Sequence, residues 1–536
     1  MQWLLILLCA VFGAPVVTLL GSWLTFDQAA WATLAHQSST VLPEYAGQSL
    51  LLAVGVGLGV ALVGVGAAVV VTLFRFPGRA VFEWAMLLPM AMPGYVLAYA
   101  YTDALQFSGP LQTALRESLG RSGALWPDVR SLGGAVVLFV LCLYPYVYLL
   151  TRAALSERGV RMMEAARTLG AGMGRRLWAV ALPLARPAMA AGVALALMET
   201  LADYGVGSFF GLSTFTTGIY RAWLSMNDPT AAAQLATLLL LVVGALLLLE
   251  RRAQSQLRFS AAPAAPHHVA DAQPVALHGM LSVGAFCLCA LPLLLGFVLP
   301  VVWLLIMLWR EASPGGLGLP GSTFVAASLN SLGLAAAAAV LATMLSVLIG
   351  FFLRRQDEVG DRVLSWGARV LSLGYAVPGA VVAIGILWPL GWLQQVWPQS
   401  GVTAWVTGTV LGVLYAYGVR FSAVSLQTVE AGYARLPYSL DETARLLGGQ
   451  RWRIFTRLHL PLLQRSVWAS ALLVFVDVMK ELPATLVLRP LGSDTLAVVA
   501  YNLARDERLS EAALPSLAIV VVGLIPVVLL SRAMKH

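Results

Sequence analysis

The sequence has few charged residues and almost no lysine. Asp, Glu, Lys and Arg make up 11% of its 536 residues, whereas 59% are hydrophobic. A soluble domain carries about 25% charged residues, so this chain cannot cover a water-facing surface. The deficit excludes a disordered chain, a collagen, a coiled coil and a disulfide scaffold, and it predicts a protein whose main solvent is lipid.

Lysine occurs only at Lys480 and Lys535, which are followed by Glu481 and His536. A phosphate-binding P-loop needs a lysine followed by serine or threonine. The chain therefore cannot bind ATP through such a loop, and we expect it to hold no cofactor of its own.

Cysteine is equally scarce. Cys9, Cys142, Cys287 and Cys289 all lie in apolar runs, and none belongs to a C-x-x-C pair. We interpret them as small buried hydrophobic residues, which leaves no disulfide framework and no zinc site.

Long apolar runs, by contrast, are abundant. A helix needs about 20 apolar residues to cross the bilayer core, and such runs occur twelve times. They fall at 2–24, 48–74, 81–104, 132–151, 188–207, 231–249, 280–308, 330–353, 366–392, 403–427, 467–487 and 512–531. The predicted fold class is an all-α integral membrane protein with twelve transmembrane helices.

The arginines set the expected orientation. If the N-terminus is cytoplasmic, most of the 34 basic residues fall in cytoplasmic segments, whereas the opposite orientation would place them outside. Both termini are therefore expected in the cytoplasm. The same bias accounts for most of the net charge of +8, so no nucleic-acid partner is needed to explain it.

The two groups of six runs are repeats. Residues 251–278, rich in Ala, Pro and His, separate a first half, 1–250, from a second half, 279–536, and are predicted to be a flexible cytoplasmic linker. The segment 164–183 recurs at 442–461, with every matched residue displaced by 278 positions. A second match joins Met92-Pro93-Gly94 to Val377-Pro378-Gly379. We expect two like-oriented six-helix halves, related by an axis along the membrane normal.

Each repeated loop is predicted to be a helix, a glycine turn and a second short helix. Gly170 is a natural residue to end the first helix, and Ser439 to Glu442 form an S-x-x-E pattern typical of a capping box. The second helix is expected to end near Pro183 or Pro461. Such an arginine-rich helix could rest on anionic lipid or dock a soluble partner, and the repeated spacing of the same residues favours docking.

The pattern resembles the coupling loop of ABC importer permeases. Its matching residues in the first copy are Glu164, Ala165, Ala166, Gly170, Val180, Leu182 and Pro183; in the second they are Glu442, Ala444, Gly448, Leu460 and Pro461, with Thr443 in place of the first alanine. The resemblance covers nearly the whole chain and implies the type I importer permease fold in a bacterial inner membrane. It also implies that the two loops dock two copies of a cytoplasmic ATPase, which would carry the ATP and Mg.

A narrower resemblance concerns the substrate. Residues 199–205, 214–221 and 480–490 resemble segments of fused ferric-iron permeases. This implies transport of ferric iron delivered by a periplasmic iron-binding protein. Fused permeases for thiamine share the architecture, and those for sulfate, molybdate or polyamines share the loop, so another small solute or anion stays an alternative.

Four acids are candidates for the transport pathway. Glu199 and Asp203 are matched by Asp477 and Glu481, and each pair is expected on one face of the span that follows the coupling loop. A charge at the middle of a bilayer costs roughly 2.5–3.5 kcal/mol, so these acids should face the bundle interior, a water-filled path or each other.

Two interpretations of the acids remain open. Together with Tyr204 they could line a path for Fe³⁺, which prefers oxygen ligands, without forming a stable site, because a conduit must release its cargo. Alternatively they mark span ends at the outer interface, with Lys480 paired to an acid. A secondary transporter of 6+6 spans would leave the repeated loop unexplained, and an enzyme would need a nucleophile or metal cluster that the sequence does not show.

Overall fold

The structure, a computed structural model, describes residues 2–24, 35–156, 160–259, 274–312, 320–354 and 359–533. The chain forms two compact units, and each unit contains segments from both halves of the sequence. Unit 1 comprises Met1–His36, Ile219–Leu240 and Leu319–Val499; unit 2 comprises Gln37–Gly218, Leu241–Gly318 and Ala500–His536. The predicted halves describe the order of the repeats along the chain, whereas these units describe how the helices pack.

Unit 1 is built from helices throughout its described part. Its elements are α1 (Gln2–Gly21), η1 (Ser22–Leu24), η5 (Arg221–Ser225), α16 (Gly321–Leu353), α17 (Val359–Leu371), η7 (Gly374–Ala376), α18 (Gly379–Val396), η8 (Pro398–Ser400), α19 (Val402–Gly408), α20 (Leu411–Tyr433), α21 (Ser439–Leu446), α22 (Arg451–Ile454), η9 (Phe455–His459), α23 (Leu460–Met479) and α24 (Pro483–Leu488). The first part of α13 (Pro229–Phe259) and the first four residues of α25 (Leu496–Arg505) also belong to it, and the rest of both helices belongs to unit 2.

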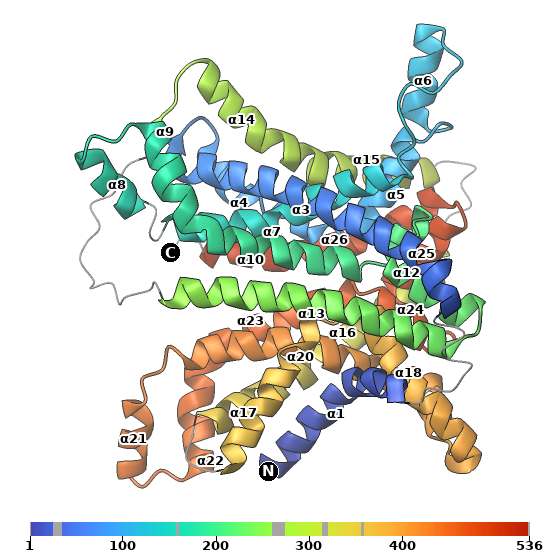
Figure 1. Ribbon diagram of the computed structural model, residues 1–536, viewed down its shortest axis with the longest axis vertical. Helices are drawn as coiled ribbons and strands as arrows, with labels where there is room; N and C mark the ends of the chain where they lie inside the picture. The colour runs from blue at the N-terminus through green and yellow to red at the C-terminus, as the bar shows by residue number, and fades with distance from the viewer. Residues whose placement is uncertain are drawn as a thin grey trace. The chain divides into compact units, whose positions relative to one another are not determined.

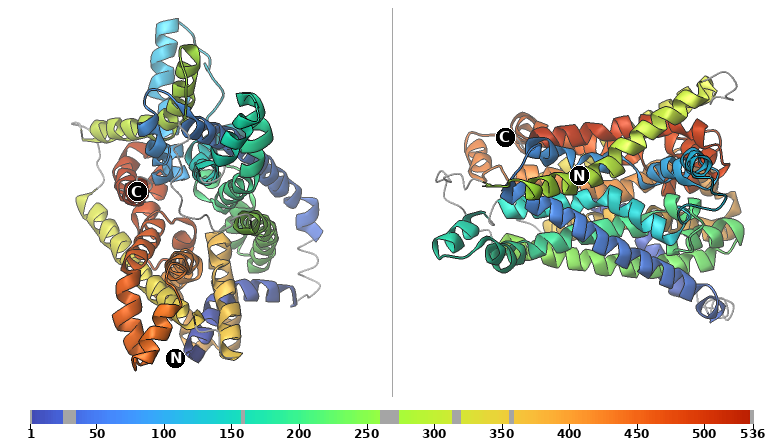
Figure 2. Two further views of the ribbon diagram at one scale, coloured as in Figure 1. Left: turned by 90° about the vertical axis from the view of Figure 1, so that its left-hand side faces the viewer. Right: turned by 90° about the horizontal axis from the view of Figure 1, so that it is seen from above.

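Unit 2 is also helical and has the only strands in the described part of the chain, β1 (Phe74–Arg75) and β2 (Val275–Ala276), which pair in parallel. Its helices are α3 (Leu42–Leu73), α4 (Arg79–Ala85), η2 (Leu88–Ala91), α5 (Gly94–Leu105), α6 (Pro110–Leu119), α7 (Leu132–Ala154), α8 (Val160–Thr168), α9 (Met173–Arg176), η4 (Leu177–Ala181), α10 (Leu182–Ala202), α11 (Gly205–Phe209), most of α12 (Phe215–Tyr220), α14 (Met280–Leu293), η6 (Leu294–Val298), α15 (Leu299–Glu311) and α26 (Leu509–Ala533). The long helices α3, α7 and α10 pack side by side (Figures 1 and 2).

The first helix of each half packs against helices of the other half. In unit 1, α1 lies against α17 and α18 (Figure 1), where Thr18 donates a 2.9 Å hydrogen bond to the carbonyl of Gly385. A Cβ on Gly385 would lie only 2.3 Å from the carbonyl oxygen of Pro15. In unit 2, α14 and α15 contact α3 and α5, and the Tyr101 hydroxyl donates to the carbonyl of Leu295 at 2.7 Å. Small residues at these crossings let the helix backbones approach closely.

The all-α architecture is confirmed, but not all twelve predicted spans are single straight helices. Nine described helices are long and apolar enough to cross a membrane, and the number rises to eleven if each of two bent pairs is one span. The bent pairs are Arg79–Ala91 with Gly94–Leu119 and Val402–Gly408 with Leu411–Tyr433. The apolar part of α1, Leu5–Gly21, is shorter than the nine.

The predicted run 366–392 is also broken, because α17 ends at Leu371 and α18 begins at Gly379. The repeated Pro-Gly pairs explain two of these breaks. Pro93 and Pro378 each precede a helix in extended conformation, with ψ of 143° and 142°, and neither can donate the N–H that would continue the preceding helix.

The prediction of a flexible linker from residue 251 was wrong at its beginning, since α13 continues to Phe259. Residues 251–259 are mostly Arg, Ala, Gln and Leu, which favour helix even where the apolar pattern has stopped. Residues 260–273 of the predicted linker lie outside the described residues.

Candidate functional site

The two repeated loops adopt the same local structure. Gly170 and Gly448 both have left-handed backbone, with φ of 80° and 74°. The N–H of Gly170 bonds to the carbonyl of Arg167 at 2.9 Å, and the N–H of the next residue reaches back to Ala166 at 3.0 Å. The second loop repeats both bonds between Gly448 and Arg445 and between Gly449 and Ala444. This Schellman arrangement ends α8 and α21 as the sequence predicts.

Leucine side chains stand at the tip of each loop. Leu169 is 88% exposed and its counterpart Leu447 is 83% exposed. The candidate residues Ala165, Gly170, Glu442 and Gly448 are exposed as well, and Ala166, Leu182, Pro183, Ala444 and Leu460 are partly buried, while Pro461 is exposed. Glu164 lies in α8, but its side chain falls outside the described residues. The loops therefore present apolar tips. Leu169 and Leu447 lie within the repeated segments, but the sequence did not single them out as candidate docking residues.

Two details of the predicted loops were wrong. The second short helix does not end at the proline, because the chain runs from α9 through the π-helical segment η4 into α10, and from α22 through η9 into α23. A π turn widens the helix, so that Pro183 and Pro461 fit at the second position of the helix that follows. The capping box is also absent, since α21 begins at Ser439 without a side-chain cap.

The loops differ in what holds them against the rest of their units. In unit 2, Met163 and Ala181 pack in an apolar cluster with Val69, Leu73 and Leu155. In unit 1, the matched positions are Asp441 and His459, and both residues are buried.

Asp441 binds two partners, the Arg354 guanidinium and Nε2 of His459. Arg354 also donates to the carbonyls of Tyr433, Leu436 and Pro437 at 3.0, 2.9 and 3.0 Å. Burial raises the pKa of Asp441, but hydrogen bonds from Arg354 and His459 outweigh it and hold the pKa below its usual range. The ionised Asp441 carboxylate therefore stabilises the folded state at neutral pH. This contribution is lost only as the pH falls through the lowered pKa of Asp441.

The candidate pathway acids are not arranged on one helical face, which corrects that prediction. Asp203 follows the end of α10 in extended conformation, and its Oδ1 accepts the N–H of Val206, the second residue of α11, at 2.8 Å. Thr216 donates to the Asp203 carbonyl at 2.7 Å. Asp203 thus caps α11, the short helix that follows the span. Because this role needs an extended backbone, α10 ends before Asp203.

Glu481 has the same capping role and is buried at 4% exposure. Its carboxylate accepts the N–H of Ala484 at 2.9 Å and of Thr485 at 3.0 Å, together with the Thr485 hydroxyl. Arg420 completes the set with an ion pair of 3.2 Å. A Cβ on Gly379 would lie 2.7 Å from Oε1 of Glu481, so the repeated Pro-Gly turn leaves room for this carboxylate.

The other candidates fall into two groups. In unit 1, Lys480 pairs with Asp477 at 2.9 Å, as the interface interpretation expects. In unit 2, Tyr204 accepts a hydrogen bond of 3.3 Å from Tyr501. Glu199 is partly buried on α10 and makes no hydrogen bond or ion pair with another described residue. Within the described ranges, no three His, Cys, Asp or Glu side chains are placed to hold a metal ion.

Sequence reasoning missed Arg420, Arg354 and His459. The signal was present, because a buried carboxylate needs a partner. The sequence did not show which arginine reaches which acid, since Arg354 and Asp441 are far apart along the chain.

The family model for "Binding-protein-dependent transport system inner membrane component" matches residues 60–253 and again residues 344–536. The chain belongs to this family. It is therefore a multi-pass inner-membrane permease component, and each match contains one of the two loops.

Relatives of the permease include transporters named for different substrates. It is 26% identical to the Fe(3+)-transport system permease protein FbpB 2 of Haemophilus influenzae over 92% of this chain and 90% of the relative. It is 22% identical to the ferric transport system permease protein FbpB of Actinobacillus pleuropneumoniae over 78% of this chain and 61% of the relative. It is 28% identical to the putative 2-aminoethylphosphonate transport system permease protein PhnV of Salmonella typhimurium over 39% of this chain and 75% of the relative.

Proposed function

We propose that the permease moves ferric iron from the periplasm to the cytoplasm, with energy from ATP hydrolysed by two copies of a cytoplasmic ATPase subunit. A periplasmic iron-binding protein delivers the iron. The two arginine-rich loops and both termini are cytoplasmic in this proposal. The names of the relatives that match most of the chain support iron, and the family supports a binding-protein-dependent system.

The observation that carries the ATPase proposal is the recurrence of one docking shape in both halves. Each loop is a helix that ends in a left-handed glycine and exposes a leucine beside it, Leu169 or Leu447. The recurrence of an exposed leucine at the same place beside arginines in both loops fits a surface that a protein partner covers. Two such loops in one chain fit two ATPase subunits.

The geometry sharpens the pathway proposal. Glu481 is saturated by Arg420 and its helix N–H groups, and Asp477 is paired with Lys480, so these acids are poor ligands for a passing cation. Glu199 is the candidate carboxylate that no described residue engages. We assign it the role of guiding the cation, with Asp203 and Tyr204 near the end of the same helix.

A small anion is the second candidate substrate. The neutralised acids of unit 1 remove much of the negative charge that would favour a cation, and the match to the 2-aminoethylphosphonate permease covers part of the chain. Uptake assays with ferric iron and with phosphonate separate the two candidates.

We expect Gly170→Pro and Gly448→Pro to abolish uptake while the permease stays in the membrane. Proline fixes φ near −65° and has no N–H, so it cannot adopt the positive φ of these glycines or donate the bond that ends the helix. Uptake of radioactive iron and ATPase co-purification, each normalised to membrane-inserted permease, measure the effect.

Gly172→Pro is the matched control in the same loop. Its φ is already −66° and open space surrounds it, so proline fits and uptake should stay near the wild-type rate. Normal ATPase association in both Gly170→Pro and Gly448→Pro would contradict the docking role.

A further inference from the structure

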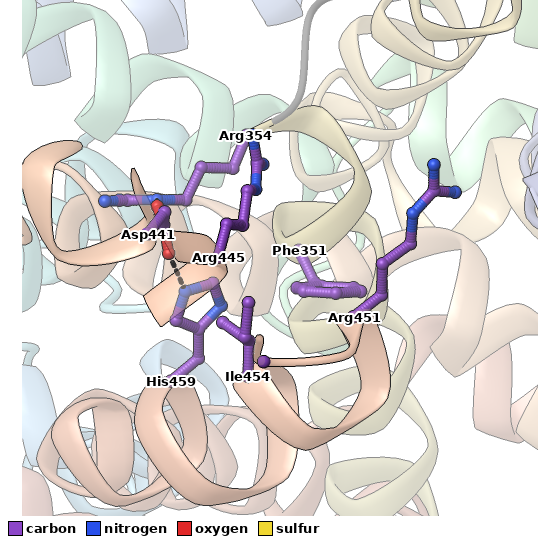
Figure 3. Close-up of a pocket in the computed structure, with 8 residues that line it drawn as sticks. Phe351, Arg354, Asp441, Arg445, Arg451, Ile454 and His459 are labelled. Carbon is purple, nitrogen blue, oxygen red and sulfur yellow. Dashed lines mark hydrogen bonds and ion pairs between the residues drawn. The ribbon is translucent and has the colours of Figure 1, made fainter. Parts of the chain in front are cut away.

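A cavity of about 270 Å³ lies beside the second loop, within unit 1 (Figure 3). Its lining residues are Phe351, Arg354, Asp441, Arg445, Gly449, Arg451, Ile454 and His459. At the matched positions of the first loop, Asp441, Arg451 and His459 are replaced by Met163, Met173 and Ala181. The polar lining is therefore particular to one of the two loops.

The cavity lining carries more positive charge than it neutralises. The one carboxylate in the lining, Asp441, already binds Arg354 and His459. Arg445 and Arg451 make no ion pair or side-chain hydrogen bond with any described residue. Figure 3 shows Arg445 extending toward Arg354, with Arg451 beyond Phe351 in this view. Among the described residues, these two guanidinium groups therefore have no counter-charge.

His459 adds a buried polar atom that lacks a partner. The residue is 4% exposed, Nε2 contacts Asp441, and Nδ1 has no hydrogen-bond partner among the described residues. Buried polar atoms in folded proteins are nearly always hydrogen-bonded. A ligand in the cavity would supply what Nδ1 and the two arginines lack.

We propose that this cavity binds a phosphate group. Arginine presents planar pairs of N–H donors that match phosphate oxygens, and a phosphate group carries about −1.5 to −2 charges at pH 7, which balances Arg445 and Arg451. The cavity has room for the group and for part of what it is attached to.

The bound phosphate would join α21, α22 and the end of α16, because Arg445, Arg451 and Arg354 lie on or beside these three elements. It would hold the second loop and leave the first untouched. Two copies of one ATPase subunit, docked one on each loop, do not require a polar lining at only one of the loops, so the site is a regulatory input. That last step rests on the proposed docking function, whereas the binding site does not.

The test uses the full-length permease in nanodiscs of phosphatidylcholine, without ATPase, and inorganic phosphate as the probe. We expect saturable binding of one phosphate per chain by calorimetry. Arg445→Gln should weaken it at least about tenfold, and Arg451→Gln should also weaken it. Arg167→Gln, at the matched position of the first loop, should leave it unchanged.

Nanodiscs containing phosphatidylglycerol distinguish two sources of the phosphate. If a lipid headgroup fills the cavity, phosphatidylglycerol competes with the added phosphate; if free phosphate or a soluble phosphorylated molecule fills it, binding is the same in both lipids. Absence of saturable binding in phosphatidylcholine, or equal binding by wild type and Arg445→Gln, would overturn the proposal. Neither result would bear on ATPase docking, which is measured separately.

Discussion

Replacing Leu169 and Leu447 together by aspartate should remove ATPase association and iron uptake while the permease remains folded. Both side chains are almost fully exposed, so the permease alone loses little stability. A docked partner would bury each leucine, and burial of one leucine is worth about 1.5–3 kcal/mol. Each substitution should therefore weaken docking by about tenfold or more, and a buried aspartate adds a desolvation penalty. Pull-down with the ATPase subunit measures the loss.

Leu491→Asp is the control for this pair. Leu491 is fully exposed and lies between α24 and α25, away from both loops in the sequence. The same chemical change there should leave ATPase association at the wild-type level. Retained association in the double Leu169→Asp/Leu447→Asp variant would contradict the assignment of these tips as docking residues.

Arg420→Met should destabilise the permease by about 3–5 kcal/mol, because it leaves the buried Glu481 carboxylate without its cation. Glu481→Gln should also be costly, since Arg420 then loses its ion pair with Glu481. The double substitution removes both charges and should cost less than the sum of the two. Thermal unfolding of the purified variants in detergent gives the coupling energy.

These variants separate two roles for Glu481. A structural cap predicts that stability and uptake fall together in Glu481→Gln and recover in part in the double variant. A carboxylate that guides cations would instead lose uptake at unchanged stability, and additive stability changes would show that the pair is not coupled.

The loops were the part of the site that sequence predicted best. Only glycine adopts the backbone of Gly170 and Gly448 at little cost, so their repeated spacing was enough to predict where the two helices end. The tips could be matched for the same reason, because Leu169 and Leu447 precede those glycines. Positions 170 and 448 need a positive φ and are occupied by glycine, so this kind of local structure can be predicted from residue type.

The pathway acids were harder to predict. Spacing of four residues places side chains on one face only if the helix continues, and α10 and α23 both end just before the second acid. Both helices end there because Asp203 and Glu481 cap the short helices that follow. Arg420, on another helix, also pairs with Glu481. The sequence also did not predict that α1 packs against helices of the second half, because apolar runs do not specify their packing partners.

The most direct test of the account is iron uptake by vesicles that contain the permease and its ATPase, supplied with iron-loaded binding protein outside and ATP inside. We expect uptake that requires both ATP and the binding protein, and a lower rate with Glu199→Gln at unchanged ATP hydrolysis. Uptake that follows a proton or sodium gradient without the ATPase, or transport of phosphonate in place of ferric iron, would contradict it.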